Sequence, residues 1–311
     1  MKNNPKVSII IVHFFGVDYI VNCLDSVFKS DYSNFEVIVV FNGNKDGSYE
    51  TVREKFPQVV SILNKKNLGF DKANNQGIKK SKGEIIFLLN DDTVIHPRLI
   101  SVLAKELISS DNIGIVGPKI YKYNTNNIWF AGGKIDWVKQ ESYHLGRNIR
   151  DKDLKDDRKR EVDFITGCAL MIKKEVIDKI GLLDETFFAF YEDADWCQKA
   201  KKAGYKVIYI PFGGVWHHIA VTTSRVFFGP EKEKNCLWLL MIYLWRCLKK
   251  EFRDYRNRFI FFNRHLLTNL KFKFFLKFIF ISTPTFFYSA VYKIPRSLAY
   301  IFLKKKKTRK K

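Results

Sequence analysis

The sequence lacks several patterns that mark well-defined classes of protein. It contains only 8 prolines and 17 glycines in 311 residues, which excludes a collagen-like or linker-dominated chain. Its five cysteines are odd in number and form no C-x-x-C pair, and residues 1–5 do not resemble the start of a signal peptide. We therefore expect reduced thiols in a cytosolic compartment.

Two longer patterns are also missing. No G-x-G-x-x-G follows the first apolar run, which ends in FFGVD at residues 14–18, so a nicotinamide-binding dehydrogenase is disfavoured. From residue 236 onward, the longest stretch without a charged residue is 278–292, which has 15 residues and contains Pro284. A helix that spans a bilayer needs about 20 apolar residues. This stretch is therefore too short to cross a membrane alone.

Positive charge is what the chain has in excess, and it is concentrated towards one end. Lys and Arg number 54 against 32 Asp and Glu, for a net charge of +22. Residues 226–311 hold 21 basic and 4 acidic residues, a net charge of +17, while residues 1–225 carry only +5. Because 46% of all residues are hydrophobic, a packed core is expected. We predict a folded domain over 1–225 and a separate basic region over 226–311.

The basic region interleaves Phe, Leu, Ile and Tyr with Lys and Arg. Lys271, Lys273, Lys277 and the run at 304–311 are typical of helical segments that lie in an anionic membrane surface. We expect peripheral attachment to the cytoplasmic membrane, and the alternative is a helical cap with a solvated tail. A specific nucleic-acid partner is disfavoured, because the basic residues lie among long aliphatic and aromatic runs.

Residues 1–225 alternate between apolar strand patterns and helical patterns. Strands are predicted at 7–14, 35–41, 59–63, 84–89 and 206–210, and helices at 17–28, at 49–56 and within 67–80 and 181–204. The predicted fold class is α/β, with a mostly parallel central sheet flanked by helices. Such sheets bind ligands beyond the carboxyl ends of their strands. The charged segment 147–161 is predicted to be a mobile loop, and 211–214 a turn.

The first candidate for chemistry is the acidic pair that follows the strand at 84–89. Asn90, Asp91, Asp92 and Thr93 come directly after it, which predicts carboxylates that are exposed yet rigidly held at the edge of the sheet. Hard oxygen ligands of this kind suit Mg²⁺ or Mn²⁺, and such an ion completes its shell with substrate phosphates. An ordinary turn is the alternative, because acidic pairs after strands are common.

Two further clusters lie downstream. Glu192, Asp193 and Asp195 fall within four positions beside an aromatic run, so repulsion and a low local dielectric can raise one carboxyl to a useful general-base pKa. A helix start, where acids are favoured by the helix dipole, is the alternative. The third cluster is His217 and His218, of which we expect at most one to bind a metal, because adjacent side chains project differently.

Taken in this order, the motifs resemble the inverting family 2 glycosyltransferases of the GT-A (Rossmann-like) fold, in particular a rhamnosyltransferase-like branch. The resemblance covers about residues 6–225 and rests on KVSIIIVHF, NLGFDKANNQGI, IIFLLNDDT, the segment 166–197, and AGYKVIYIP with the following WHH. It implies a metal-dependent enzyme that moves a sugar from a nucleoside-diphosphate donor to a saccharide or lipid-linked saccharide hydroxyl in surface polysaccharide synthesis. The implied reaction is a single displacement that inverts the anomeric centre.

The resemblance also implies roles for particular residues. Asp92 would be the metal-binding carboxylate, with Mg²⁺ or Mn²⁺ as cofactor, and His217 an additional contact to the metal or the diphosphate. Asp193 would be the catalytic base and Glu192 its neighbour. The acceptor would meet Asp195, Trp196 and Gly167. The donor would meet Asn42, Asp46, Asn67, Gly69, Lys72, Asn75, Asn90 and Asp91.

One position departs from the family pattern. The loop after the second strand commonly begins with an Asp that contacts the donor's base, and here that position is Phe41, followed by Asn42. Asp46 is retained later in the loop. The alternative within the enzyme class is a transferase that places a sugar directly on a polyprenyl phosphate, and such enzymes commonly carry clear spanning helices.

Overall fold

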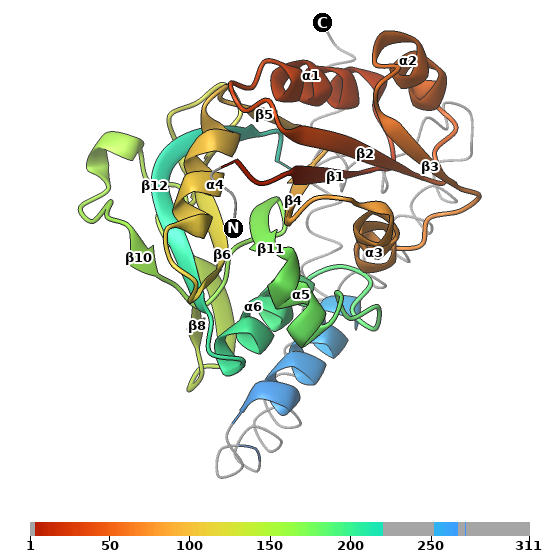
Figure 1. The fold of residues 1–311 in the computed structure, drawn as a ribbon. Helices are drawn as coiled ribbons and strands as arrows, with labels where there is room; N and C mark the ends of the chain where they lie inside the picture. Colours follow the sequence, from red (N-terminus) through yellow and green to blue (C-terminus); the bar gives the residue numbers. More distant parts are fainter. Residues whose placement is uncertain (1–3, 220–251, 267–270, 272–311) are drawn as a thin grey trace, which may run out of the picture. The chain divides into compact units, whose positions relative to one another are not determined.

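The computed structural model describes residues 4–219, 252–266 and 271 (Figure 1). The chain divides into two compact units, Met1–Thr222 and Thr223–Lys311. In the second unit, residues 252–265 are helical. Among the described residues, no helix is long and apolar enough to span a bilayer. Lys273, Lys277 and the run 304–311, which carry the membrane prediction, lie outside the described residues.

The first unit contains the strands and helices that position the candidate site. Its strands are β1 (Val7–His13), β2 (Phe35–Asn42), β3 (Val60–Asn64), β4 (Ile85–Asn90), β5 (Thr93–Ile95), β6 (Ile113–Lys122), β7 (Ile128–Phe130), β8 (Gly133–Asp136), β9 (Glu141–His144), β10 (Arg160–Glu161), β11 (Ala169–Lys173) and β12 (Lys206–His217). Its helices are α1 (Val17–Phe28), α2 (Ser48–Lys55), α3 (Phe70–Lys80), α4 (Leu99–Ile108), α5 (Lys174–Ile180) and α6 (Glu192–Lys202), with one 3₁₀ turn, η1 (Asp151–Asp153).

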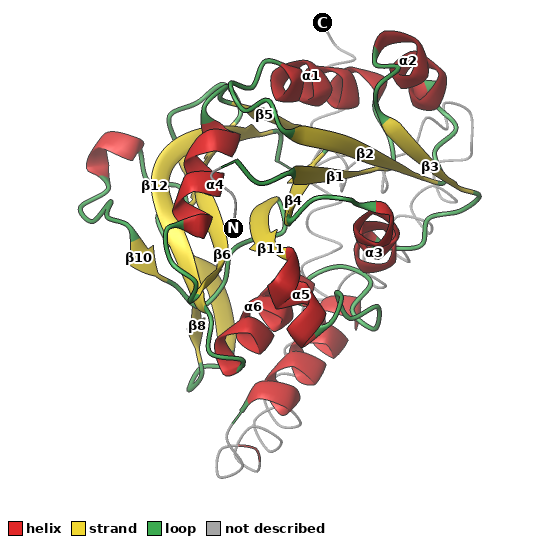
Figure 2. Cartoon of the chain, in the orientation of Figure 1, coloured by secondary structure: helices red, strands yellow, loops and turns green. Residues whose placement is uncertain are grey.

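The fold is α/β and its central sheet is mostly parallel, as predicted. Its strand order is β10-β12-β6-β11-β4-β1-β2-β3, with β5 paired to β12 and β7 to β6 (Figure 2). β1 pairs in parallel with β2 and β4, and β6 pairs in parallel with β12. β11 lies antiparallel between β4 and β6. The carboxyl ends of β1, β2 and β4 therefore meet at one edge.

The middle of the sheet is buried on both faces. β1 and β4 are almost wholly apolar along their length, and Ile9, Ile10 and Phe87 are fully buried. Figure 1 shows α1 and α3 on opposite sides of β1 and β2. α3 approaches β1 so closely that a Cβ on Gly77 would lie 2.4 Å from Cγ2 of Ile10. The continuous apolar runs of these strands are explained by this two-sided cover.

The structure corrects the turn that was predicted at residues 211–214. β12 continues through this segment to His217, with register shifts on either side of Gly213. A Cβ on Gly213 would lie 2.2 Å from the hydroxyl oxygen of Tyr121. The glycine therefore permits close packing within a strand, which is the other common reason for glycine in a strand pattern.

The charged segment 147–161, predicted as a mobile loop, is anchored to the sheet. The buried Nζ of Lys119 lies 2.6 Å from Oδ1 of Asp151 and 2.5 Å from Oδ2 of Asp157. The hydroxyl of Tyr209 also donates to Asp157, at 2.8 Å. Because a buried ammonium requires paired counter-charges, Lys119 fixes the acidic residues of this segment in place.

Candidate active site

The acidic pair and the histidine pair meet at the edge of the sheet. β12 runs antiparallel to β5 with His217 opposite Thr93, which brings His217 beside the preceding residue, Asp92. Nε2 of His217 lies 3.1 Å from Oδ1 of Asp92, and the backbone N–H of His218 donates to the Asp92 carbonyl at 2.9 Å. The sequence predicted exposed carboxylates, but Asp91 and Asp92 are each only 5% exposed. Asp92 is packed against His217 of β12, and Asp91 against His13 of β1.

The charge of His217 is controlled by its neighbours. Burial alone would lower the pKa of His217, because it disfavours the imidazolium. Contacts with the Cys168 sulfur and the Asp92 carboxylate more than offset burial and raise the pKa of His217 well above its ordinary value. Nδ1 of His217 is buried without a hydrogen-bond partner. Without an ion, Asp92 and His217 thus form a buried ion pair, and both could serve as metal ligands once a bound ion displaces the imidazolium proton.

This donor set fits a divalent ion that is shared with a substrate. Asp92 and His217 supply one carboxylate and one imidazole, both common ligands of Mn²⁺-like ions. Among the described residues, no group of three or more His, Cys, Asp or Glu side chains could enclose a metal. An ion held by this pair would therefore take its remaining ligands from water and phosphate oxygens, as Mg²⁺ usually does.

Asp193 is linked to the same edge through the segment 166–168. The backbone N–H of Gly167 donates to Oδ2 of Asp193 at 2.9 Å, and the backbone N–H of Ala194 donates to Oδ1 at 2.7 Å. The next residue, Cys168, accepts from the Asn90 backbone N–H at 2.9 Å. Burial raises the pKa of Asp193, and these hydrogen bonds offset part of the rise. Asp193 is thus an oriented carboxyl with the raised pKa that a general base requires.

The other residues predicted near an acceptor take up packing positions. Trp196 is fully buried, and its indole N–H donates to the Gly181 carbonyl at 2.9 Å. Asp195 is 1% exposed and pairs with Lys199 at 2.8 Å. A Cβ on Gly167 would lie 3.1 Å from the Phe70 ring. Neither Asp195 nor Trp196 is presented to solvent, and Gly167 orients Asp193.

Glu192 begins α6 and is 7% exposed. The preceding residues, Phe190 and Tyr191, have positive φ values of 75° and 73°, which are rare for aromatic residues. Strained backbone of this kind is found preferentially at functional sites. The helix start that was the alternative explanation of the acidic cluster is real, and it coexists with the orientation of Asp193.

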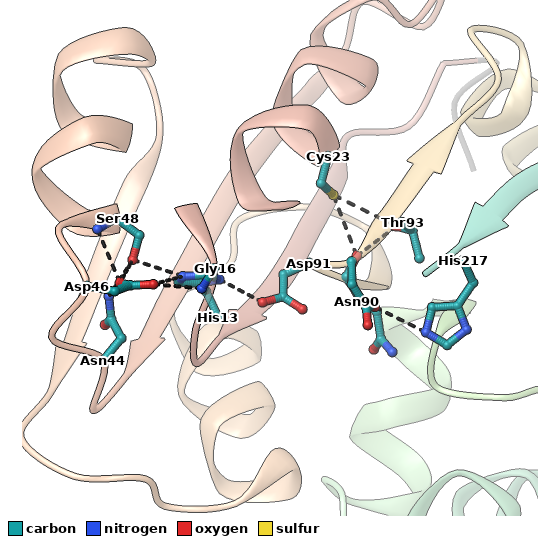
Figure 3. Close-up of polar contacts among 11 residues, drawn as sticks. His13, Gly16, Cys23, Asn44, Asp46, Ser48, Asn90, Asp91, Thr93 and His217 are labelled. Carbon is teal, nitrogen blue, oxygen red and sulfur yellow. Dashed lines mark hydrogen bonds and ion pairs between the residues drawn. The ribbon is translucent and has the colours of Figure 1, made fainter. Parts of the chain in front are cut away.

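His13, which the sequence analysis did not single out, forms the centre of a buried polar network. Its Nδ1 lies 2.6 Å from Oδ2 of Asp91, and its Nε2 lies 2.9 Å from Oγ of Ser48. Figure 3 shows the imidazole between Asp91 on one side and Asp46 with Ser48 on the other. His13 is fully buried at the end of an apolar strand. Only its polarity within that strand could have indicated it.

Asp46, predicted to meet the donor, accepts hydrogen bonds from residues of its own loop and from Gly16. Oδ1 accepts hydrogen bonds from the Ser48 hydroxyl and from the Asn44 amide, and Oδ2 accepts from the Gly16 backbone N–H at 2.6 Å. Although partial burial would raise the pKa of Asp46, the hydrogen bonds lower it to about 2. The carboxylate is therefore ionised and already well supplied with donors from the chain. Its contact with a donor base stays a prediction.

Asn42 and Asn67, also predicted to meet the donor, join the loops after β2 and β3. The Asn42 side-chain N–H donates to Oδ1 of Asn67 at 3.1 Å and to the Gly69 carbonyl at 3.2 Å, and its Oδ1 accepts from the Leu68 backbone N–H. Oδ1 of Asn67 also accepts from the Gly69 N–H. These amides shape the loops that a donor would meet.

Residues of α3, together with Gly69 just before it, contact the segment 183–188 that precedes Asp193. The Asn75 amide donates to the Leu183 carbonyl at 2.9 Å and accepts from the Leu183 N–H at 3.1 Å. A Cβ on Gly69, where φ is 90°, would lie 2.6 Å from the Phe188 ring. Lys72 is half-exposed and lies 3.8 Å from Glu185. Asn75 and Gly69 thus contact the segment 183–188, and the donor contacts of Asn75, Gly69 and Lys72 stay predictions.

Two aromatic side chains around His217 were also missed from the sequence. The Trp129 ring centroid lies 4.5 Å from that of His217 and 4.8 Å from that of His144. Burial, with the positive charge of Arg147, lowers the pKa of His144 to about 4. These residues come from β7 and β9, which are short and give no periodic signal. Trp129 is partly exposed and places an aromatic ring beside His217.

Comparison with known proteins gives a consistent result. The profile of the family described as glycosyl transferase family 2 matches residues 8–181. An uncharacterized glycosyltransferase of Rickettsia typhi is 30% identical over 193 residues, which is 60% of this chain and 57% of the relative. An N-acetylglucosaminyl-diphospho-decaprenol L-rhamnosyltransferase of Mycobacterium tuberculosis is 25% identical over 211 residues, 61% of this chain and 68% of the relative.

The fold also matches solved structures. The structure of GalNAc-T7 with UDP, GalNAc and Mn²⁺ aligns with a TM-score of 0.58 at 20% identity, over 70% of this chain and 44% of that one. This likeness establishes the GT-A fold. The chain spans between 25% and 57% of the length of three curated relatives that it matches.

Proposed function

The chain belongs to glycosyl transferase family 2, and from this premise we propose that it transfers a sugar from a nucleoside-diphosphate donor with the help of a divalent ion at Asp92 and His217. The observation that carries the proposal is the assembly of three clusters at one edge of the sheet. Asp92 and His217 lie in contact, and the segment 166–168 links Asp193 to Asn90 beside them.

In this proposal Asp92 and His217 act on the leaving group, and Asp193 acts on the nucleophile. A divalent ion held by Asp92 and His217 would neutralise the charge that develops on the diphosphate leaving group. Asp193 would accept the proton of the acceptor hydroxyl as that oxygen attacks the anomeric carbon. The backbone N–H groups of Gly167 and Ala194 hold its carboxylate in one orientation. A single displacement of this kind inverts the anomeric centre.

The acceptor that we propose is a saccharide or lipid-linked saccharide in surface polysaccharide synthesis. The mycobacterial relative is named for L-rhamnosyl transfer to N-acetylglucosaminyl-diphospho-decaprenol, which supports this class. Trp129 supports it as well, because a partly exposed ring beside His217 can pack against the apolar face of a sugar. Direct transfer to a polyprenyl phosphate is the second candidate.

Purified protein is expected to release a nucleoside diphosphate from at least one nucleotide sugar only when Mg²⁺ or Mn²⁺ is present. The reason is that a nucleoside diphosphate gains negative charge as the bond to the anomeric carbon breaks, and it leaves poorly unless that charge is neutralised. UDP-, GDP- and dTDP-sugars would be tested with each ion and with EDTA, and the nucleotide product measured by chromatography. Release that is unchanged by EDTA would contradict the metal role, and no release from any donor would contradict the donor class.

We also propose that the basic region attaches the enzyme to the cytoplasmic face of an anionic membrane. The supporting observation is its composition, since residues 226–311 carry a net charge of +17 among many aromatic residues. Each basic residue near such a surface contributes about 1 kcal/mol. Deletion of residues 304–311 is expected to weaken flotation with anionic liposomes and to make release by salt easier. Equal flotation with neutral and anionic liposomes would contradict the proposal.

A further inference from the structure

His13 connects two loops that are far apart in the sequence and that a donor would meet together. One loop follows β4 and carries Asp91, directly before Asp92. The other follows β2 and carries Ser48 and Asp46. The imidazole lies 2.6 Å from Oδ2 of Asp91 and 2.9 Å from Oγ of Ser48, and 4.0 Å from Oδ2 of Asp46 (Figure 3).

The contacts of His13 are buried, and a hydrogen bond lost there is not readily replaced by one to water. His13 is fully buried, Ser48 is fully buried and Asp91 is 5% exposed, so water cannot replace a lost partner without entering the core. Removing the imidazole would take this hydrogen-bond partner from a buried carboxyl, and leaving a buried polar group unsatisfied is costly enough to favour movement of the loop that carries it.

The position of Phe41 gives the connection a further significance. The resemblance implies that a base-contacting Asp would stand at this position, and the ring of Phe41 instead packs edge-on against His13 with centroids 5.8 Å apart. Phe41 is fully buried and also packs against Tyr49 of α2. An aromatic residue here cannot accept a hydrogen bond from a base. It can hold the imidazole in place.

We propose that His13 is a positioning residue that couples the nucleotide side of the site to the metal side. His13 holds Asp91 and the loop 44–48 together. It thereby fixes the distance between that loop, which would contact the nucleoside, and Asp92, which would bind the ion. Binding of one ligand therefore favours binding of the other. This inference rests on the proposed function and adds to it a residue that no metal or donor atom has to touch.

The test is a thermodynamic cycle on the full chain. The affinity of UDP, GDP and dTDP is measured by calorimetry with and without Mn²⁺, and the ratio of the two dissociation constants gives the coupling. Allosteric coupling of this kind typically amounts to about 5- to 150-fold. His13→Ala is expected to reduce the ratio by about tenfold or more, and His13→Gln, which can still reach one of the two loops by a hydrogen bond, should restore part of it.

Ser8→Ala is the matched control, because Ser8 is also buried on β1 and also joins two neighbours, Glu36 and Gly83. It lies at the other end of the strand, so it should lower the melting temperature and leave the ratio unchanged. If His13→Ala keeps the wild-type ratio, the coupling role is wrong while the proposed function stands. If no nucleotide binds to wild-type protein with Mn²⁺, the proposed function itself fails. If His13→Ala does not fold, an unchanged ratio in His13→Gln and Ser48→Ala overturns the inference.

Discussion

Asp92→Asn is expected to lower sugar transfer by about 10³-fold or more at ordinary metal concentration, because Lewis-acid stabilisation of a leaving group is worth several kcal/mol. Asparagine has nearly the shape of aspartate, so it should fit the same buried position 3.1 Å from Nε2 of His217. What is lost is the negative charge. Turnover measured against Mn²⁺ concentration, together with the melting temperature, separates loss of metal binding from loss of fold.

The two adjacent histidines provide the control for this prediction. His217 is buried against Asp92, whereas the His218 ring stacks on Tyr123 with centroids 3.5 Å apart. His217→Ala should therefore raise the Mn²⁺ concentration needed for half-maximal turnover much more than His218→Ala. Equal effects would show that His217 has no special place at the metal, and full turnover of Asp92→Asn would exclude Asp92 as a ligand.

Asp193→Asn is expected to lower turnover by about 10²- to 10⁴-fold, the usual contribution of a general base. The amide keeps an oxygen that can accept from Gly167 or Ala194, so the segment 166–168 should stay in place. It cannot take the proton of the acceptor hydroxyl. Donor affinity, measured by calorimetry in the absence of acceptor, should remain within about threefold of wild type, because no donor contact is removed. A threefold change corresponds to about 0.6 kcal/mol of binding free energy.

Glu192→Gln serves as the neighbouring control for the base. Glu192 is buried at the start of α6, and its amide analogue should have a milder effect on turnover than Asp193→Asn. If Glu192→Gln proves more damaging, the roles within the pair are reversed. A parallel loss of donor affinity and turnover in Asp193→Asn would instead place Asp193 among the donor or metal contacts.

The elements that could be predicted are the buried strands, because burial on both faces requires a continuous run of apolar residues in the sequence. β1, β2 and β4 are apolar because both faces of the sheet are covered, and this can be read from the residues alone. β5 and β7 have three residues each and depend on pairing with distant strands, so no local period marks them. Gly213 was misread as a turn residue because close packing against Tyr121 and a turn both favour glycine.

The same distinction applies to the site. The association of Asp92 with His217 follows from the order of the family motifs and is present in the structure. His13 could not be predicted, since a single polar residue at the end of an apolar strand does not reveal which loops it will join. Trp196 was predicted to face the acceptor because it adjoins the acidic cluster in sequence. Its position on α6 instead directs the side chain into the core.

The central claim is that a divalent ion binds at Asp92 together with the diphosphate of a nucleotide, and electron paramagnetic resonance of Mn²⁺ tests it most directly. Titration of wild-type protein with Mn²⁺ should show weak binding alone, and close to one ion bound per chain once a nucleoside diphosphate is added, because the protein supplies only part of the coordination shell. Asp92→Asn should lower the signal of free Mn²⁺ no further than the nucleoside diphosphate alone lowers it under the same conditions. Binding of Mn²⁺ by Asp92→Asn with wild-type affinity and stoichiometry would contradict the account.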